Sequence, residues 1–240
     1  MHRAISAVKS VLFPKTCAGC GRIIPEDDGL CCYCHEAIAR CDPLKRCMQC
    51  GLDKNKCQCS NRVFSFDACI APFKNTGIAK HAMYHFKYRR KITYGVMLAK
   101  QMALCVKNEY RNVKLDAVCY VPMHRRKQSE RGFNQSAVMA KVIAELLGLP
   151  HLSALKCVKY VRSQHELPFK QRLENVKNMY SATRRLDGLR LLLVDDIKTT
   201  GATLNECAQT LLSAGADRVY CVTALVTVPE DKKLKKKEAR

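Results

Sequence analysis

Apolar residues after position 63 follow two alternating patterns along the chain. Short segments rich in apolar residues predict strands over 66–73, 115–121, 155–161, 189–195 and 219–226, and the continuous apolar run over 191–194 is typical of a strand that is buried on both faces. Between them, apolar residues recur at helical spacing over 76–90, 92–110, 133–147 and 203–214. Strands that alternate with helices of these lengths predict an α/β fold, with a parallel sheet flanked by helices.

Other parts of the chain depart from this alternation. Residues 162–177 are polar with weak periodicity, which fits either a mobile lid or hood, or a plain surface excursion. Residues 1–16 are expected to form a short helix before a cysteine-rich stretch. The patterns divide the chain into a cysteine-rich domain over 1–62, an α/β domain over 63–228 and a basic tail over 229–240.

The most informative stretch is the turn that follows the predicted strand over 189–195. A four-residue apolar run leads into Asp195 and Asp196, and then into Thr-Thr-Gly-Ala-Thr over 199–203. Neighbouring side chains of a strand point to opposite faces, so the two carboxylates can meet on one ligand only where the chain has left the sheet. We therefore expect both acids to lie just past the strand.

The residues of this turn suit a phosphorylated sugar. Paired carboxylates need hydroxyl donors, backbone N–H groups or a metal ion to offset their repulsion. Threonine hydroxyls, a glycine and the N–H groups of a helix start together suit a phosphate monoester. A ribose 5-phosphate offers both hydroxyls and phosphate. The simpler interpretation, solvated acids with Thr203 as a helix cap, leaves the combination of acids, threonines and glycine unexplained.

Composition limits the class of protein. With 240 residues and 48% hydrophobic residues, the chain can form a globular core with a small appendage, or two small domains. No apolar run approaches the length of about 18 residues that spans a membrane, and the first residues lack the apolar core of a signal peptide. We therefore expect a cytoplasmic protein without membrane insertion.

The chain is strongly basic, with 42 Lys and Arg residues against 21 acidic ones and a formal net charge of +21. Such a charge favours a polyanionic partner, although a Lys-rich tail and a sugar-phosphate site account for part of it. Cations and aromatic residues are interleaved over 76–90, as in surfaces that bind single-stranded DNA, but a solvated cationic face explains them equally well. The candidates for nucleic-acid contacts are Lys87, Arg89, Arg90, Lys91, Arg126 and Arg131.

Ten of the 16 cysteines lie between positions 17 and 59, and the other six are isolated in apolar segments, where we expect small buried side chains. The clustered cysteines form two sets, which are Cys17, Cys20, Cys31 and Cys34, and Cys47, Cys50, Cys57 and Cys59. Two thiolates on a tight turn can share one tetrahedral zinc ion, and a segment this poor in apolar residues needs such a staple. One structural zinc ion per set is the simplest assignment.

Alternatives stay open within this cysteine-rich stretch. Cys32 and Cys41 belong to neither set, and either can replace a neighbouring ligand. The two sets can also be interleaved. Because the spacing of Cys57 and Cys59 is irregular, the number of zinc ions is either one or two. Redox-active thiols would usually need just one Cys-x-x-Cys near a helix start. Four thiolates per ion leave no open coordination position, so such ions would be structural.

The turn over 191–203 closely resembles the loop that binds phosphoribosyl diphosphate (PRPP) in type I phosphoribosyltransferases. By this resemblance, Asp195 and Asp196 would hold the ribose hydroxyls and are the catalytic candidates, and residues 199–203 would hold the 5-phosphate. In those enzymes the loop that corresponds to Met123–Arg125 cradles the pyrophosphate, often through a strained backbone, and Mg²⁺ accompanies it. The PRPP-binding candidates are Asp195, Asp196, Lys198, Thr199, Thr200, Gly201, Ala202, Thr203, Met123, His124 and Arg125.

Several further motifs, in order, resemble the ComF family of phosphoribosyltransferase-like proteins, which are linked to natural competence. The motifs are the paired cysteine knuckles, Phe86-Lys-Tyr88, Val121-Pro-Met-His124, Arg131-Gly-Phe-Asn-Gln135, Gln164 through Arg172 with Asn175, and the phosphate loop. The resemblance covers residues 12–226 and departs from the family pattern at Cys57-Gln-Cys59. It implies a type I phosphoribosyltransferase-like sheet flanked by helices, with a small N-terminal zinc-binding domain.

The resemblance also implies a function. The main expectation is a PRPP-binding protein that handles incoming single-stranded DNA in the cytoplasm during natural transformation, beside a ComFA-type helicase. The alternative is an active phosphoribosyltransferase of nucleotide metabolism or salvage that transfers phosphoribose from PRPP to an unidentified acceptor, for which no base pocket is evident in the sequence. A third hypothesis is a zinc-stapled scaffold with a vestigial phosphate loop. The oligomeric state stays open.

Overall fold

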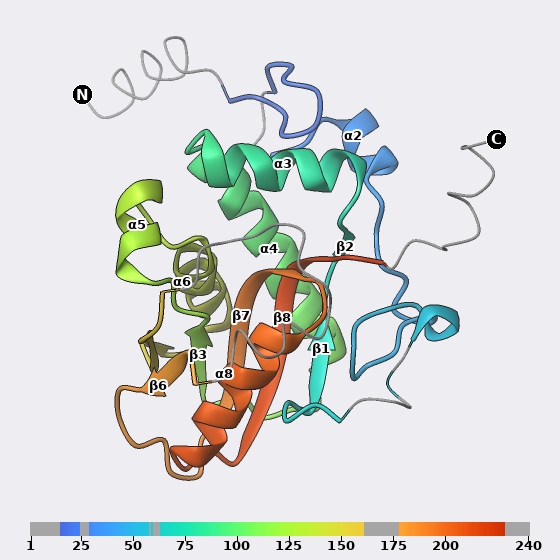
Figure 1. The fold of residues 1–240 in the computed structure, drawn as a ribbon. Coiled ribbons are helices and arrows are strands. Elements are labelled where there is room, and N and C mark those ends of the chain that lie inside the picture. Colours follow the sequence, from blue (N-terminus) through green and yellow to red (C-terminus); the bar gives the residue numbers. More distant parts are fainter. Residues whose placement is uncertain (1–14, 25–28, 58, 60–62, 161–177, 229–240) are drawn as a thin grey trace, which may run out of the picture.

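The computed structural model describes residues 15–24, 29–57, 59, 63–160 and 178–228. Its centre is a parallel sheet with strand order β1-β8-β7-β3-β4, in which β2 also pairs with β8 (Figure 1). The strands of this sheet are β1 (Ala68–Ile70), β2 (Phe73–Lys74), β3 (Ala117–Tyr120), β4 (His151–Leu152), β7 (Arg190–Lys198) and β8 (Arg218–Val226). A separate antiparallel pair consists of β5 (Leu155–Cys157) and β6 (Tyr180–Ala182).

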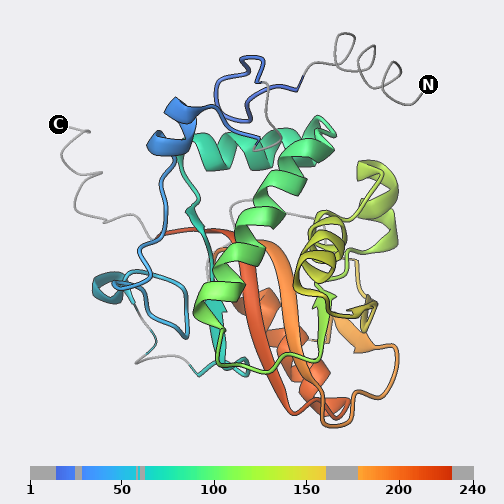
Figure 2. The same ribbon diagram turned by 180° about the vertical axis from the view of Figure 1, so that it is seen from behind.

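Helices cover both faces of the sheet, as the sequence predicted. The helices of the described residues are α2 (Cys32–Ala37), α3 (Gly77–Tyr88), α4 (Ile92–Glu109), α5 (Arg125–Arg131), α6 (Gln135–Leu147) and α8 (Ala202–Ser213), with a 3-10 turn η1 at Lys54–Lys56. Helices α4 and α6 lie on one face and α8 on the other, as Figure 1 and Figure 2 show from opposite sides. Helix α3 crosses the carboxyl ends of the central strands (Figure 1). The predicted α/β class is therefore confirmed.

Successive residues of β7 alternate between two apolar cores. Leu192 and Val194 belong to the core beneath α3, α4 and α6, whereas Leu191 and Leu193 belong to the core beneath α8. All four side chains are fully buried. A strand covered on both faces needs apolar residues at every position, which explains the continuous apolar run in the sequence.

The pairing of the central strands determines where the acids of β7 lie. Strand β3 pairs with β7 from Ala117↔Leu191 to Tyr120↔Val194. Strand β8 pairs with β7 further, up to Lys198↔Val226. Strand β7 therefore projects beyond β3 from Asp195 onward, and the chain that leaves β3 turns away beside this projecting part.

Three strand predictions differ from the structure. The segment 66–73 forms β1 and β2 rather than one strand, because Pro72 between them cannot donate a ladder hydrogen bond. Strand β5 covers just the start of the predicted 155–161 and pairs with β6, outside the parallel sheet. Strand β7 continues to Lys198, so the prediction that Asp195 and Asp196 lie past the strand is wrong.

Helix α5 replaces part of the loop that was expected to cradle pyrophosphate. Its sequence, Arg-Arg-Lys-Gln-Ser-Glu-Arg, has no apolar position that would reveal helical spacing. The N–H of Arg126 donates to His124 Nδ1 at 3.2 Å and caps its start, and Gly132 ends it with a left-handed φ of 86°. No residue of 121–125 has a positive φ or a cis peptide bond, so the expected backbone strain is not found there.

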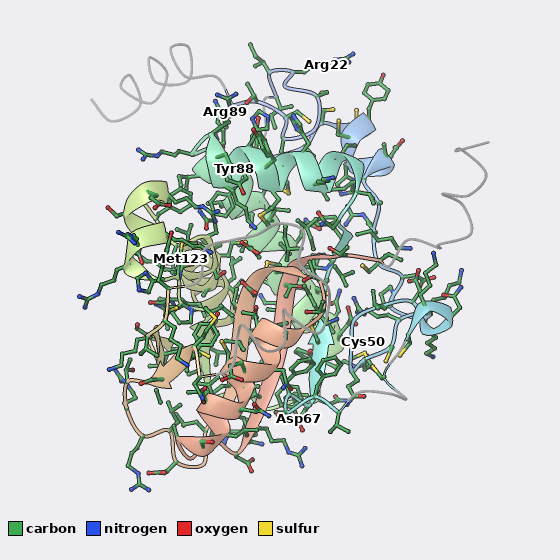
Figure 3. All side chains as sticks on the ribbon, in the orientation of Figure 1. Arg22, Cys50, Asp67, Tyr88, Arg89 and Met123 are labelled. Carbon is green, nitrogen blue, oxygen red and sulfur yellow. The ribbon has the colours of Figure 1, made fainter. Side chains whose placement is uncertain are left out.

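The cysteine-rich segment packs against two different parts of this unit. Its first half contains α2 and packs on α3, where His81 Nδ1 lies 3.1 Å from the carbonyl oxygen of Ala18. Its second half lies beside β1, where the N–H of Cys69 donates to the carbonyl of Met48 at 2.8 Å. Figure 3 labels Cys50 in this second half. The domain boundary after residue 62 stays a prediction.

The six isolated cysteines fall into two groups. Four of them, Cys69, Cys119, Cys207 and Cys221, are buried as expected. Cys105 and Cys157 are partly exposed, which differs from the prediction. Cys105 lies on α4, where its thiol donates to Glu109 Oε1 at 2.9 Å.

Some sequence expectations concern residues that the structure does not describe. The first helix up to residue 14, the lid over 162–177 and the basic tail over 229–240 lie outside the described ranges. Within those ranges, none of the helices has the length and apolar character that crossing a membrane requires.

Candidate functional site

A cavity of about 170 Å³ opens where β3 and β7 end. Asp195 and Asp196 both line it, and they are its acids among the described lining residues. The other lining residues are Val121, Pro122, Met123, His124, Lys127, Arg131, Asn134, Ser136, Cys157, Lys159, Met179 and Tyr180. Figure 3 labels Met123 at the end of β3. The two acids therefore reach one cavity, although they are neighbours within a strand.

Two hydrogen bonds fix the orientation of Asp195. The hydroxyl of Ser136 donates to Asp195 Oδ1 at 2.9 Å, and the backbone N–H of Asp196 donates to the same oxygen at 2.8 Å. Burial, together with the neighbouring charge of Asp196, raises the pKa of Asp195 to about 7, against the lowering effect of the two donors and of Lys87. Asp195 is thus a carboxyl group that titrates near neutral pH.

Asp196 forms an ion pair with Lys87 from the last turn of α3. The Lys87 Nζ lies 2.6 Å from Asp196 Oδ2, and the two side chains are 15% and 17% exposed. Alternation along β7 puts Asp196 on the same side as Leu192 and Val194, which is the side that α3 covers. The structure therefore places Lys87, a nucleic-acid candidate in the sequence, at the acid pair.

A smaller cavity of about 20 Å³ lies in the turn after β7 and shares Asp195 with the larger one. Its other lining residues are Ile197, Lys198, Thr199, Thr200, Gly201, Ala202, Thr203 and Leu204. Gly201 has a φ of 83°, and a Cβ at this position would lie 3.0 Å from the ring of Phe64, so the turn needs glycine. Helix α8 starts directly after Gly201, and its first N–H groups border this smaller cavity, which we call the cup.

Basic residues line the larger cavity on the side of α5. His124, Lys127 and Arg131 line it, whereas Arg125 is exposed and does not. Positions 124, 127 and 131 share one face of a helix, which explains why the candidate Arg125 points elsewhere. Arg131 is held in place because its Nη1 donates to Gln135 Oε1 at 3.0 Å.

The remaining nucleic-acid candidates lie on the outer surface. Residues 89–91 are exposed at the end of α3, next to Tyr84 and Tyr88, each of which is 50% exposed. The two tyrosine rings lie 5.0 Å apart. Figure 3 labels Tyr88 at this end of the helix. Arg126 lies apart from this group, with its guanidinium 5.3 Å from the ring centre of Tyr160.

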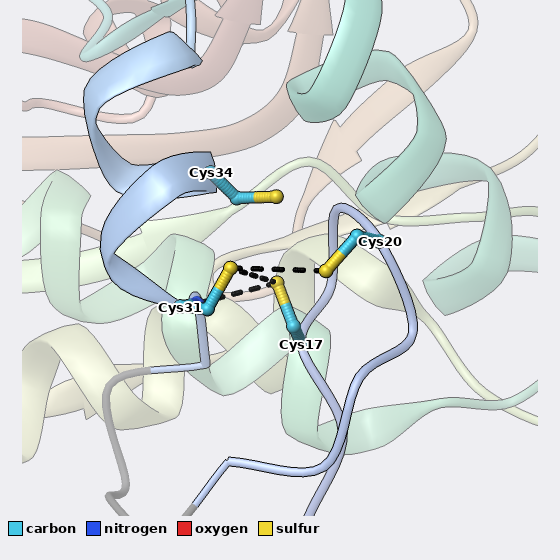
Figure 4. Close-up of side chains that lie close together, drawn as sticks. All are labelled: Cys17, Cys20, Cys31 and Cys34. Atoms are coloured by element: carbon cyan, nitrogen blue, oxygen red, sulfur yellow. Dashed lines mark hydrogen bonds between the residues drawn. The ribbon is translucent and has the colours of Figure 1, made fainter.

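The thiols of Cys17, Cys20, Cys31 and Cys34 gather at one point between α2 and the preceding loop (Figure 4). The sulfur of Cys31 lies 3.7 Å from those of Cys17 and Cys20. Zinc–sulfur bonds of about 2.3 Å in a tetrahedron separate the sulfurs by about 3.8 Å. Although burial raises it, backbone N–H donors lower the pKa of the Cys17 thiol to about 6. The donors and spacing fit one metal ion.

The second set of thiols gathers in the same way. All four sulfurs of Cys47, Cys50, Cys57 and Cys59 lie within 4.8 Å of one another. The distances are 3.9 Å between Cys47 and Cys59 and 3.6 Å between Cys50 and Cys57. The irregular Cys57-Gln-Cys59 therefore completes this set, and the sets are not interleaved. Cys32 and Cys41 belong to neither group.

Two residues at the start of α6 were not identified from the sequence. Asn134 caps the helix by accepting from the N–H groups of Ser136 and Ala137, and its Nδ2 donates to the carbonyl of Val121 at 3.1 Å. Asn134 thereby joins the end of β3 to the helix, and it brings Ser136 to Asp195. The available signal was an Asn-x-Ser helix start immediately after a polar stretch.

Comparison with known proteins identifies relatives of this chain. Residues 134–240 match the phosphoribosyl transferase domain family. The chain is 29% identical to DNA utilization protein YhgH of Salmonella typhi over 205 residues, which are 81% of this chain and 89% of the relative. It is 27% identical to Competence protein F of Haemophilus influenzae over 216 residues, or 85% and 93% of the two chains. It is 32% identical to Competence protein ComFC of Bacillus subtilis over 99 residues, or 40% and 38%. The chain is therefore similar, over most of its length, to proteins named for competence and DNA utilization, and its C-terminal part matches the phosphoribosyl transferase domain family.

Proposed function

We propose that this protein binds PRPP, with Mg²⁺, in the joined cavities beside Asp195. The observation that supports this most strongly is that the acid pair and the turn over 199–203 form two cavities that share Asp195. The ribose hydroxyls would donate to the two carboxylates, and the 5-phosphate would accept from the threonines and backbone N–H groups of the cup. The diphosphate would then extend into the larger cavity.

The charges of the larger cavity support the same orientation. Lys127 and Arg131 line the same cavity as the acids and provide donors for diphosphate oxygens. Bound Mg²⁺ would neutralise part of the diphosphate charge, and the open cavity between acids and cations has the oxygen donors that this ion prefers. PRPP carries ribose hydroxyls, a 5-phosphate and a diphosphate, and its groups therefore match the charge pattern of the two cavities.

Calorimetric titration with PRPP and Mg²⁺ tests this proposal. The wild-type protein should bind, and a variant with both Asp195→Asn and Asp196→Asn should not, because each lost charged hydrogen bond costs about 1.5–3 kcal/mol. Asp187→Asn serves as the control, because Asp187 is 60% exposed and pairs with Arg185 away from the cavity. No heat with the wild-type protein, or equal affinity in the double variant, would contradict the proposal.

Single-stranded DNA is the second partner that we propose, with a role in handling incoming DNA in the cytoplasm during natural transformation. The relatives are named for competence and DNA utilization, and the chain carries a net charge of +21. Tyr84 and Tyr88 offer exposed rings for base stacking, which contributes about 1–3 kcal/mol per base, and residues 89–91 add cations beside them. A ComFA-type helicase is proposed as the protein partner on family grounds alone.

Fluorescence anisotropy with a labelled oligodeoxythymidine tests the DNA proposal. Affinity should fall steeply with salt, and a variant with Arg89→Ala and Lys91→Ala should lower the slope of log K against log salt by about 0.7 for each phosphate contact removed. The double Asp→Asn variant should keep its DNA affinity, because its change lies in the cavity rather than on α3. Loss of DNA binding in that variant would contradict separate sites.

Each cysteine group is proposed to hold one structural Zn²⁺ ion. The sulfur spacing in both groups supports this, and four thiolates leave no open coordination position. Elemental analysis of the purified protein should find two zinc ions per chain, and Cys20→Ser should lower the content to one. A content that stays at one in the wild-type protein would contradict the second site.

An active phosphoribosyltransferase is the alternative function. The acid pair favours it, because Asp195 and Asp196 would anchor the ribose while an acceptor atom bonds to C1, the C1–oxygen bond breaks and diphosphate leaves. Such a reaction relies on electrostatic stabilisation and needs little from a side-chain acid or base. Release of diphosphate from PRPP in the presence of a defined acceptor would establish this activity, and binding without release with nucleobase acceptors would favour the binding function.

A further inference from the structure

Lys87 reaches the acid pair from outside the sheet, on a helix whose end is firmly anchored. The residue before it, Phe86, is fully buried, and its ring lies 5.3 Å from that of Phe133. The residue after it, Tyr88, packs under the guanidinium of Arg131 at 5.2 Å. Gly95 of α4 leaves room for Phe86, because a Cβ there would lie 2.4 Å from the ring. Lys87 is therefore directed to Asp196 by the packing of its neighbours.

In the free protein, Lys87 is the counter-ion of Asp196, next to Asp195. Its Nζ lies 2.6 Å from Asp196 Oδ2 in a pair whose side chains are mostly buried. Asp195 lies next to Asp196 and is sensitive to the same positive charge. Two neighbouring carboxylates in a partly buried site do not both stay ionised unless a cation is close. Lys87 supplies that cation.

A ligand with ribose hydroxyls changes this balance. The hydroxyls donate to the carboxylates and take the place that the ammonium group holds in the free protein. A diphosphate in the larger cavity would add more negative charge near Asp196, which lines that cavity and pairs with Lys87. The lysine side chain has a flexible four-carbon stem and three donors, so its ammonium group can move from a carboxylate to a phosphate oxygen without movement of α3.

We propose that Lys87 is a diphosphate-binding residue that neutralises Asp196 in the free protein and moves to the diphosphate of PRPP when the ribose hydroxyls occupy the acid pair. This inference rests on the proposed binding of PRPP. It assigns Lys87 a specific consequence: the residue favours a ribose phosphate that carries a diphosphate over one that does not. A lysine that merely supports the acids would make no such distinction.

Paired titrations with PRPP and with ribose 5-phosphate, both with Mg²⁺, test this inference. Lys87→Met keeps the apolar stem and removes the charge, and it should weaken PRPP binding about 10- to 100-fold, as expected for one charged hydrogen bond. At a pH where Asp195 is ionised in both proteins, binding of ribose 5-phosphate should be unchanged or tighter, because the hydroxyls no longer compete with an ammonium group. Lys87→Arg should keep most of the PRPP affinity. Lys80→Met, which removes an exposed charge from the same helix, is the control.

The pH dependence of binding provides a second measurement. PRPP affinity of the wild-type protein should rise with pH as Asp195 ionises, and Lys87→Met should move the midpoint of that rise to higher pH, because loss of a cation favours the protonated carboxyl group. If the Met variant does not fold, Lys87→Gln can replace it in both the paired titrations and the pH measurements.

The outcomes separate this inference from the proposed function. Equal weakening for PRPP and ribose 5-phosphate would overturn the diphosphate role and leave Lys87 as a support of the acids. Unchanged or tighter PRPP binding in Lys87→Met would overturn it as well, because the lysine would then merely obstruct the site. Failure of the wild-type protein to bind either ligand would instead refute the PRPP site itself, and the role of Lys87 with it.

Discussion

Replacing Asp195 by Asn should stabilise the protein at pH 8 but not at pH 4. Burial and the charge of Asp196 raise the pKa of Asp195 from 3.8 to about 7 in the folded protein. A carboxyl group whose pKa is raised by folding favours the folded state below its unfolded pKa, and this contribution is lost as pH rises through the folded pKa. Asparagine has no charge to bury, and its side-chain oxygen can accept the same hydrogen bonds from Ser136 and from the N–H of Asp196.

The magnitude follows from the difference between the two pKa values. A rise of about three units, at about 1.4 kcal/mol each, sets an upper limit of about 4 kcal/mol on the difference in free energy of unfolding. Asp195 lines the cavity, where water screens part of its charge, so we expect about 2 kcal/mol at pH 8. The difference should be near zero at about pH 4 and should grow up to about pH 7, where ionisation of the folded state nears completion.

Urea unfolding of the wild-type protein and Asp195→Asn, at several pH values between 4 and 8, measures this difference directly. Asp187→Asn is the control, because an exposed pair with Arg185 contributes little at any pH. An Asn variant that is no more stable than the wild-type protein at pH 8 would refute the argument. A stability gain that is the same at every pH would refute it too, because it would not arise from the ionisation of Asp195.

Three further predictions concern the same site. Gly201→Ala should cost about 1–2 kcal/mol of stability and weaken PRPP binding. Gly148 also has a positive φ but no atom near the new Cβ, so Gly148→Ala should lower stability without changing PRPP binding. Thermal unfolding measures the stability and titration measures the binding. Ser136→Ala should weaken PRPP binding about tenfold by removing a donor to Asp195, as measured by calorimetry. Removal of zinc with a chelator, or Cys20→Ser, should weaken PRPP binding by loosening the support of α3, and readdition of zinc should restore the chelated protein but not the variant.

The sheet could be predicted from the sequence because its central strands are buried on both faces. Every position of β7 from Leu191 to Val194 faces one core or the other, and the resulting apolar run is visible without a structure. The position of the turn over 199–203 follows equally well, since Gly201 has a left-handed φ that few other residues adopt. A strand that is buried on both faces and a turn that needs glycine can therefore both be predicted from the residues that form them.

The end of β7 could not be predicted, because it depends on a neighbouring strand. The side-chain alternation rule is correct, yet it does not keep Asp195 and Asp196 apart, since β3 ends opposite Val194 and leaves both acids beside open space. Strand β8 continues to pair with β7 up to Lys198 and keeps this part extended. How far one strand projects beyond its neighbour is a property of the sheet register, which the sequence of one strand does not contain.

Helix α5 was missed for a different reason. A short polar helix has no apolar stripe, and the periodicity of the sequence is the signal that reveals helices. This omission affected the predicted site residues, because helical spacing turns Lys127 and Arg131 toward the cavity and Arg125 away from it. The type of residue at the site was predictable, but the choice among neighbouring cations required the backbone.

The two cysteine groups contact different elements of the candidate site, so metal ions bound there would have a role beyond folding. The first group packs on α3 through Ala18 and His81, and the same helix carries Lys87 to the acid pair. The second group shares an apolar cluster with Phe64, whose ring lies against the phosphate turn at Gly201. Each contact joins parts of the chain that are far apart in sequence, so composition alone could suggest a staple but not what it holds. If each group holds one metal ion and PRPP binds as proposed, loss of the first ion should disturb α3 and therefore the diphosphate and ribose. Loss of the second ion should disturb Phe64 and therefore the 5-phosphate.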